Sequence, residues 1–411
     1  MKILTLCGLL VLSLAAPVPA VLCAVDEVPA ATLLIPHFMV DLDACGSPGL
    51  NTVVKITNTE PTSTVVHLTF WTDWGAPVID YDLYLTGFDV ESLDLADHFC
   101  NGNVTVTGES VSPHGSLSGD PDQPPQCDLV LPLVNPALTA SLLDRLRYGH
   151  TGQPAVASGG CLGADHGDNV ARGYLTIDVV NDCTFLFPSQ PDYLSTFLSH
   201  ENRLLGEYFY VDPASGFYQS YPAVHLEADT AGLTFGPGDH TFYGRYASAL
   251  AIDRREPLPT TFGASFSRNE PLGTELFVWR ESPGVTDGEG ATCGSSPAEF
   301  PLTAPEVLAF DEEENPILVP VEAPLQTQRV TLVEVLPPSP EAGWMRMNLR
   351  HLALAGVYND GLAQAWVTTL SPRLVSVARG SGDPPEPLPP FAGFPAIALD
   401  NICAVAAEDQ P

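Results

Sequence analysis

Basic residues are scarce in this 411-residue chain, and lysine is almost absent. Lys and Arg together number 16 against 50 Asp and Glu, which gives a formal net charge of −34. A field of this sign repels phosphate backbones and anionic lipid headgroups. We therefore expect no nucleic-acid partner and no electrostatic docking to membranes. Two uses of the acidic surface stay open: solubility in a salty or divalent-rich exterior, and dedicated cation binding.

The motifs that announce common enzymes are also missing. His200-Glu201 is not followed by a second histidine at metalloprotease spacing, and no Cys-x-x-Cys pair or Gly-rich phosphate loop occurs. In Gly115–Gly119, Leu117 stands where a Gly-x-Ser-x-Gly nucleophile would be. A serine or cysteine nucleophile stays open, because such triads are defined by geometry. No catalytic residue is assigned, and a non-enzymatic role is favoured.

Long apolar runs are lacking after the first two dozen residues. A positive start, the apolar run 3–14 and the small residues that follow are typical of a secretory signal peptide, which we place at residues 1–24. The run is too short to span a bilayer, so no transmembrane segment is expected after signal removal. Cleavage before Val21, before Val25, or before Cys23 as in a lipoprotein all stay open. The expected location is secreted, periplasmic or at the cell surface.

Nine cysteines are present, and an exported chain meets an oxidising environment. Cys7 is removed with the signal peptide, and eight cysteines remain if Cys23 is kept or seven if it is removed as well. Eight cysteines allow 105 pairings, so sequence cannot fix the connectivity. The pairs Cys100–Cys127 and Cys161–Cys183 are the favoured predictions, since each closes a loop within one region.

Proline (40) and glycine (34) are spread throughout the chain, a density that suits short strands and opposes long helices. Alternating apolar residues predict a hairpin of strands 52–57 and 65–71, and a second hairpin of 307–310 and 317–319 around an acidic turn. Further strands are predicted at 173–180, 207–211, 241–246, 275–280, 328–335 and 364–369. Short helices are predicted at 137–146 and within 192–205.

These patterns indicate an all-β protein of two immunoglobulin-like β-sandwich domains with short helices and disulfide-stapled loops. The first domain is predicted at 25–255, with a loop and helix insertion around 100–170, and the second at 256–411. A weak internal repeat aligns Trp71 with Trp279, each followed two residues later by an acidic residue. It suggests that the two tryptophans fill equivalent cores.

The densest polar cluster contains Asp165, Asp168 and Asn169 in a glycine-containing loop. Oxygen ligands at close spacing are what calcium prefers, so these residues are candidate calcium ligands; no other cofactor is expected. The alternative is a turn stabilised by local Asp and Asn hydrogen bonds. Asp41 and Asp43 form a weaker candidate.

Two further segments have competing interpretations. The acidic turn 311–314 is either a cation site or a solvated loop tip. Residues 81–90 alternate acidic and aromatic side chains, which could stack on sugar rings, but the same pattern is typical of a buried strand with its turn.

Several segments of the chain resemble uncharacterised secreted bacterial β-rich proteins. The resemblance spans most of the mature chain, implies no activity, and transfers no site residue. Its segments are 71–74 (WTDW), 84–90 (YLTGFDV), 165–174 (DHGDNVARGY), 343–345, 364–367 and 398–403.

The favoured function is therefore that of an exported, non-enzymatic β-sandwich protein with a structural or interaction role at the bacterial envelope or exterior. Its partner would be an unknown protein or glycan. The alternatives are a secreted carbohydrate-binding protein or glycoside hydrolase, and a metal-stabilised adhesin-like module.

Overall fold

The structure is a computed structural model that describes residues 27–104, 137–350 with short gaps, 363–370 and 397–398. The gaps are 191, 215, 233–234, 236–238, 248–251, 269–272, 283, 285–289, 296, 298–301 and 303. The predicted signal peptide lies outside the described residues.

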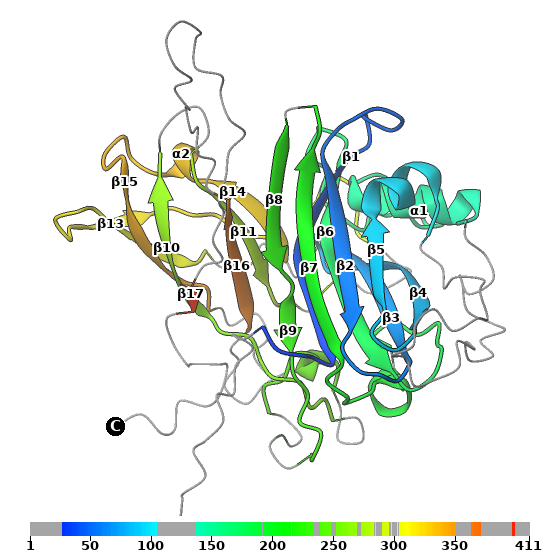
Figure 1. Ribbon diagram of the computed structural model, residues 1–411. Coiled ribbons are helices and arrows are strands. Elements are labelled where there is room, and N and C mark those ends of the chain that lie inside the picture. Colours follow the sequence, from blue (N-terminus) through cyan, green and yellow to red (C-terminus); the bar gives the residue numbers. More distant parts are fainter. Residues whose placement is uncertain are drawn as a thin grey trace, which may run out of the picture.

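The described residues form four antiparallel β-sheets, which confirms the all-β prediction (Figure 1). Sheet I has the strand order β4 (Pro77–Leu85), β3 (Thr64–Thr72), β6 (Val170–Val180), β1 (Thr32–Asp41), β9 (Val224–Leu226). Sheet II has the order β5 (Val90–Asp94), β2 (Asn51–Asn58), β7 (Leu204–Asp212), β8 (Phe217–Pro222). Sheet III has the order β14 (Thr327–Thr331), β11 (Glu275–Arg280), β16 (Ala365–Leu370). Sheet IV has the order β13 (Pro316–Val319), β12 (Glu306–Phe310), β15 (Ala342–Asn348), β10 (Thr261–Ser267), β17 (Ile397–Ala398).

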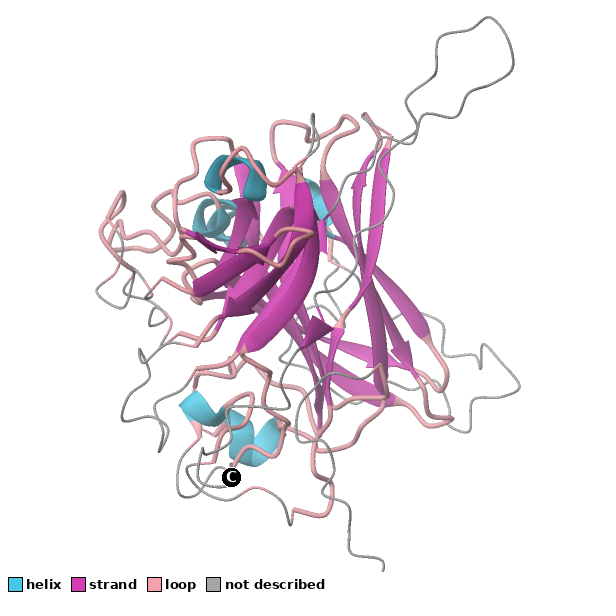
Figure 2. Cartoon of the chain, turned by 90° about the vertical axis from the view of Figure 1, so that its left-hand side faces the viewer, coloured by secondary structure: helices cyan, strands magenta, loops and turns pink. Residues whose placement is uncertain are grey.

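Helices are short and lie outside the sheets (Figure 2). They are η1 (Asp97–Asn101), α1 (Ala140–His150), η2 (Tyr193–Phe197), η3 (Gly244–Tyr246) and α2 (Leu332–Val335). Helix α1 begins after Thr139, whose hydroxyl accepts a hydrogen bond from the Leu142 amide, as expected of an N-cap. No helix among the described residues is long and apolar enough to cross a membrane.

Sheets I and II pack around the largest core. Strand β2 alternates, because Val54 and Ile56 are buried in this core while Lys55 faces outward. Strand β1 instead reads as a continuous apolar run, and both of its faces are buried: Leu33 joins the core shared with sheet II, whereas Leu34 joins a second cluster behind sheet I. Continuous apolar runs are what a strand covered on both faces requires.

Strand β11 connects the part of the molecule formed by sheets I and II with the part formed by sheets III and IV. Its side chains alternate, so Leu276 and Val278 enter the core between sheets III and IV, while Phe277 and Trp279 point the other way. Trp279 joins the cluster behind sheet I that also contains Trp71, and both side chains are fully buried. The prediction that these tryptophans fill equivalent cores is wrong, since they share one.

A bulge in β1 shapes the contact between the halves. The pairing of β1 with β6 shifts register between Ile35 and Phe38, which releases Pro36 and His37 from the ladder. The His37 ring stacks on Phe277 with centroids 4.5 Å apart, and the Pro36 carbonyl accepts a 2.7 Å hydrogen bond from the Thr327 hydroxyl. These contacts fix sheet III against sheet I.

A buried polar network lies behind sheet I. The Asp178 carboxylate is fully buried and accepts hydrogen bonds from the hydroxyls of Thr32, Tyr193 and Tyr243, the last two at 2.8 Å. The Arg255 guanidinium, also fully buried, lies 3.9 Å from the same carboxylate and donates to the Thr32 hydroxyl. Segments distant in sequence are thereby tied together.

The strand predictions at 52–57, 65–71, 173–180, 207–211, 275–280 and 364–369 are confirmed, but the first hairpin is wrong. Strand β2 pairs with β5 and β7 in sheet II, whereas β3 pairs with β4 and β6 in sheet I. The linking turn therefore crosses between sheets, and both strands pair with strands from later in the chain. The hairpin of β12 and β13 is confirmed.

Three other segments differ from their predictions. Residues 241–246 form a turn and the short helix η3. Phe242 and Tyr243 are buried in the cluster behind sheet I, but their backbone does not pair with a strand. Only η2 is helical within 192–205, and β14 ends at Thr331, after which α2 begins. The immunoglobulin-like detail and the domain division near residue 255 stay predictions.

Candidate functional site

The predicted calcium loop precedes β6, and its polar groups have protein partners. Asp168 forms an ion pair with Arg172, and this hydrogen bond lowers the pKa of the carboxyl below its usual value. The Asp165 carboxylate accepts a 2.8 Å bond from the Gly167 amide, closing a local turn. This is the arrangement expected of an Asp-rich turn.

The third candidate, Asn169, donates a 2.6 Å hydrogen bond to the Asp43 carboxylate, so the two acidic loops singled out in the sequence are neighbours. Asp41 in turn accepts a bond from the Asp43 amide. Among the described residues, no three His, Cys, Asp or Glu side chains are grouped so as to hold a metal ion. Calcium binding here stays a prediction, without a ligand cluster to argue it further.

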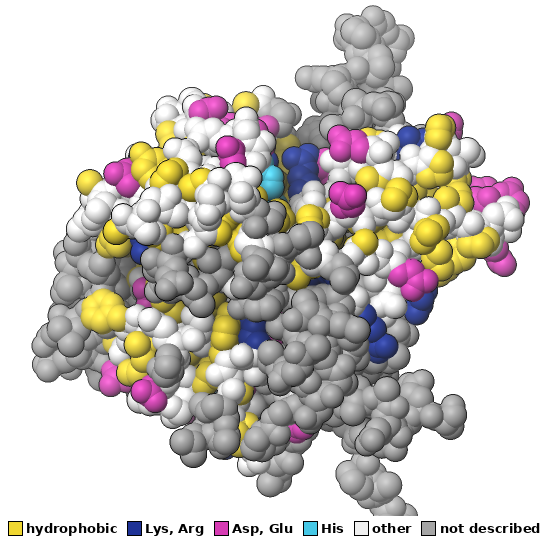
Figure 3. Space-filling view, turned by 180° about the vertical axis from the view of Figure 1, so that it is seen from behind, with side chains coloured by type: hydrophobic (Ala, Val, Ile, Leu, Met, Phe, Trp, Pro, Cys, Tyr) yellow, Lys and Arg dark blue, Asp and Glu magenta, His cyan; other side chains and the backbone are white. Residues whose placement is uncertain are grey.

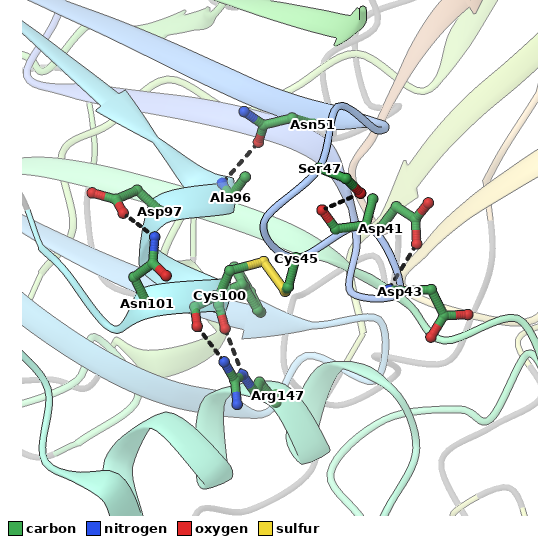
Figure 4. The surroundings of a disulfide bond; sticks show 12 residues. Asp41, Asp43, Cys45, Ser47, Asn51, Ala96, Asp97, Cys100, Asn101 and Arg147 are labelled. Carbon is green, nitrogen blue, oxygen red and sulfur yellow. Dashed lines mark hydrogen bonds between the residues drawn. A yellow bond between two sulfur atoms is a disulfide. The ribbon is translucent and has the colours of Figure 1, made fainter. Parts of the chain in front are cut away.

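Cys100 forms a disulfide, but its predicted partner is wrong. It bonds to Cys45, whereas Cys127 lies outside the described residues. The bond links the loop after β1 to η1, which Arg147 also holds by donating to the carbonyls of Phe99 and Cys100 (Figure 4). The two cysteines are 55 residues apart in sequence, a separation that local loop closure does not suggest.

Cys161 bonds to Cys293, so the predicted pair Cys161–Cys183 is wrong as well. Cys183 is itself disulfide-bonded. The backbones of Cys161 and Ala291 also exchange two hydrogen bonds of 2.8 Å. This bridge spans 132 residues and connects the two predicted domains, which is why composition alone could not suggest it.

A pocket of about 220 Å³ beside the first disulfide is lined by Asp41, Asp94 and Asp97. Its carboxylates already have partners. Asp94 accepts a 2.8 Å bond from Asn51. Asp97 accepts a 2.6 Å bond from Asn101 (Figure 4). They hold η1 and the start of β2 in place.

The segment 81–90 is a buried strand and a turn, as one of its two interpretations predicts. Tyr81 and Tyr84 are buried on β4, and the Tyr81 hydroxyl bonds to His98 at 2.7 Å. Of the aromatic residues in this segment, only Phe88, in the turn, is exposed, with a positive φ of 59°. The aromatic rings of β4 are therefore unavailable to a sugar.

Large apolar side chains are exposed together on the outer face of sheet IV. Phe310 pairs directly with Trp344, and Leu308 pairs with Leu318. Successive side chains in a strand point to opposite faces, so these four lie opposite the buried Val307 and its neighbours. We call these four residues (Leu308, Phe310, Leu318 and Trp344) the exposed aromatic face.

The exposure of this face is substantial. Leu318 is 70% exposed and Trp344 is 43% exposed, while Leu308 and Phe310 are half-buried beside them. The rings of Phe310 and Trp344 stack with centroids 4.7 Å apart and planes 15° from parallel. Such a pair is held rigidly and presents an apolar surface to solvent.

Glycine at position 343 makes this stacking possible. A Cβ there would lie 2.0 Å from the Phe310 carbonyl oxygen and 3.1 Å from the Phe266 ring. Only a residue without a side chain lets β15 approach β12 so closely at this point. Gly343 therefore sets the position of the adjacent Trp344.

Carboxylates flank the exposed aromatic face. The acidic turn 311–314 directly follows Phe310, and Glu312, Glu313 and Glu314 are exposed. Asp311 organises the turn by accepting hydrogen bonds from the Asn315 side chain and from the backbone amides of Asn315 and Glu313, and these bonds lower its pKa. Within the described residues, none of the three exposed glutamates is paired with a basic side chain, so their charge is available to solvent.

Figure 3 shows hydrophobic side chains gathered beside acidic ones on the part of the molecule that carries β13 and β15. The sequence analysis identified the hairpin and its turn but not this face. The signal was present: residues 306–310 and 316–319 place apolar side chains at both alternations, so both faces of the hairpin carry apolar residues.

Comparisons with known proteins add no assignment. No family model, no curated protein and no solved structure matches this chain.

Proposed function

We propose that the protein is an exported, non-enzymatic interaction protein that binds its partner through the exposed aromatic face. The observation that carries this proposal is the grouping of two leucines and a stacked Phe–Trp pair on the open side of an otherwise packed sheet. Contiguous apolar surface with a polar rim is typical of interaction sites. Aromatic residues are also enriched at the centres of interfaces.

The disulfides support the extracytoplasmic part of the proposal. Cys45–Cys100 and Cys161–Cys293 are both bonded, and such bonds persist in oxidising compartments. The same proposal includes an immunoglobulin-like sandwich for each pair of sheets, a fold that presents rigid outer faces. Rigid faces suit binding, because little conformational freedom is lost on association.

Oxidative footprinting tests the proposal on the native protein. In the extracytoplasmic fraction, Trp344 and Leu318 should be protected from hydroxyl radicals relative to the purified chain. Tyr218, which is 50% exposed on β8, is the matched control and should react equally in both samples. Equal oxidation of Trp344 in the two samples would contradict the proposal.

A carbohydrate-binding role is the second candidate, and one observation favours it. Across from Trp344 on β10 stands Ser265, an exposed small residue that leaves the adjacent side of the indole open. A flat ring beside a hydroxyl could hold a pyranose by stacking and hydrogen bonding. Retention on immobilised neutral glycans that is lost in Trp344→Ser would support this role, and absence of retention across a broad panel would remove it.

A further inference from the structure

We infer that the partner of the exposed aromatic face is a basic polypeptide segment whose arginine side chains lie over Trp344 and pair with the carboxylates of the acidic turn. This inference rests on the proposed function and names the chemistry of the partner. It is carried by the combination of an open aromatic ring and unpaired carboxylates in one place.

The charge around the face favours a cation. Glu306 lies on the same outer side of β12, and the exposed glutamates 312–314 stand at the end of that strand. In the described strands of sheet IV, the basic residue on this outer face is Arg346, which pairs with Leu308. The carboxylates therefore outnumber the basic side chains there. A cationic partner is therefore attracted, and complementary charge speeds encounter and selects the partner.

The geometry favours arginine over lysine. A guanidinium is planar, stacks on aromatic faces and forks to carboxylates with two parallel hydrogen bonds, whereas an ammonium acts as a point charge. The hairpin register places Phe310, stacked on Trp344, directly before the acidic turn. The same molecule already contains such stacking, because the Arg245 guanidinium lies 4.6 Å from the centre of the Tyr246 ring.

The net charge disfavours a second copy of the chain as the occupant. Each copy has a formal charge of −34, so two acidic turns brought together would repel. A neutral glycan would use the indole ring but would gain nothing from four adjacent carboxylates. A basic polypeptide uses both features.

Tryptophan quenching locates the binding site. Of the five tryptophans, Trp71, Trp74 and Trp279 are buried and Trp366 is half-buried, so acrylamide quenching mainly reports Trp344. Octa-arginine at physiological salt should protect this fluorescence from acrylamide, and octa-glutamate should not. By anisotropy of labelled peptide, octa-arginine should bind roughly three- to tenfold more tightly than octa-lysine, because stacking adds to charge.

Variants separate a specific site from general attraction. Trp344→Ser and the triple variant Glu312→Gln, Glu313→Gln, Glu314→Gln should each weaken octa-arginine binding roughly tenfold or more. A matched triple variant removes the same charge from exposed acids elsewhere, through Glu60→Gln, Asp144→Asn and Asp192→Asn, and should bind like the parent.

Equal weakening by both triple variants, unchanged binding in Trp344→Ser, or protection of Trp344 by cellohexaose but not by octa-arginine would overturn the inference. Its failure is distinguishable from failure of the proposed function. If Trp344 is protected in the native extracytoplasmic fraction while octa-arginine does not protect the purified chain, only the partner chemistry is wrong.

Discussion

Sheets I and IV are both five-stranded and antiparallel, yet they differ in how far other residues cover their outer faces. The outer side of sheet I is covered by loop residues such as Phe242, Tyr243 and Leu258, and by Trp279 from β11. The outer side of sheet IV leaves Leu318 and Trp344 exposed. The chain thus contains apolar loop segments that can cover a sheet. The described residues provide no such cover for the exposed aromatic face, and this contrast supports the proposal that the face binds a partner.

The largest difference in the free energy of unfolding is expected between two variants that each replace a carboxylate by an amide, one at sheet I and one at sheet IV. Asp178→Asn, behind sheet I, removes one of the two carboxylates beside the buried Arg255, with Asp253 remaining at 3.5 Å, and it removes the charge from the bonds donated by Tyr193 and Tyr243. Breaking a buried pair costs about 3–5 kcal/mol in the free energy of unfolding. Urea unfolding followed by circular dichroism measures this loss.

Glu306→Gln on the outer face of sheet IV is the control for Asp178→Asn, since the chemical change is the same. It should alter the free energy of unfolding by less than about 0.5 kcal/mol, as is usual for exposed positions. Similar losses in the two variants would mean that burial does not separate the two sheets energetically.

Acid should weaken the packing of α1 against sheet I, on the side of the largest core. His150, at the end of α1, packs against Phe38 and Phe99, and burial lowers its pKa to about 4. A lowered pKa contributes stability above the unfolded value of 6.5, and this contribution, about 3 kcal/mol, is lost as the pH falls from 6.5 towards 4. His150→Phe should therefore lose less stability than the parent over that window in urea titrations.

His67 provides a contrast of opposite sign within sheet I. Burial alone would lower its pKa, but the hydrogen bond to Asp82 and the charge of Asp80 raise it above 6.5. Its contribution to the free energy of unfolding is present below pH 6.5 and is lost as the pH rises through the folded-state pKa.

The prediction for His150 has its own contradicting outcome. If His150→Phe kept the full acid sensitivity of the parent, the loss of stability would have to come from other buried histidines.

Local patterns predicted the strands of both sheets better than their pairing. Alternation identified β2, β3, β12 and β13, because the period-two signal belongs to each strand alone. The pairing of β12 with β13 followed from a four-carboxylate turn, whereas the turn after β2 leads into another sheet. One partner of each strand, β7 for β2 and β6 for β3, lies more than 100 residues later in the chain, and no local window contains it.

The site was harder to predict for a related reason. Polar clusters attract attention in a sequence, yet Asp168 is held by Arg172 and Asn169 by Asp43, which only the folded chain reveals. Leu318 and Trp344 look like ordinary core residues, since one sequence cannot say which apolar face stays uncovered. The disulfide between Cys161 and Cys293 similarly required the two halves to be placed together.

A methyl group at position 343 should disturb sheet IV from within. Gly343→Ala places a Cβ against the Phe310 carbonyl, so β15 must shift and the Phe310–Trp344 stack must loosen. Overpacking of this kind costs about 1–3 kcal/mol. Differential scanning calorimetry measures the loss, and near-ultraviolet circular dichroism reports the indole environment. Ser265→Ala, on the neighbouring strand, is the control, and equal effects of the two would remove the special role of the glycine.

A small change in the free energy of unfolding is expected where the consequence for binding is large. Trp344→Ser removes a ring that is 43% exposed, so the free energy of unfolding should fall by less than about 1 kcal/mol. Trp71→Ser, in the shared cluster behind sheet I, removes a fully buried ring and the 2.9 Å bond to Thr176, and should cost at least about 3–5 kcal/mol. Paired urea titrations compare the two tryptophans directly. A large loss in Trp344→Ser would show that the exposed aromatic face stabilises sheet IV itself, and its exposure would then no longer argue for a partner.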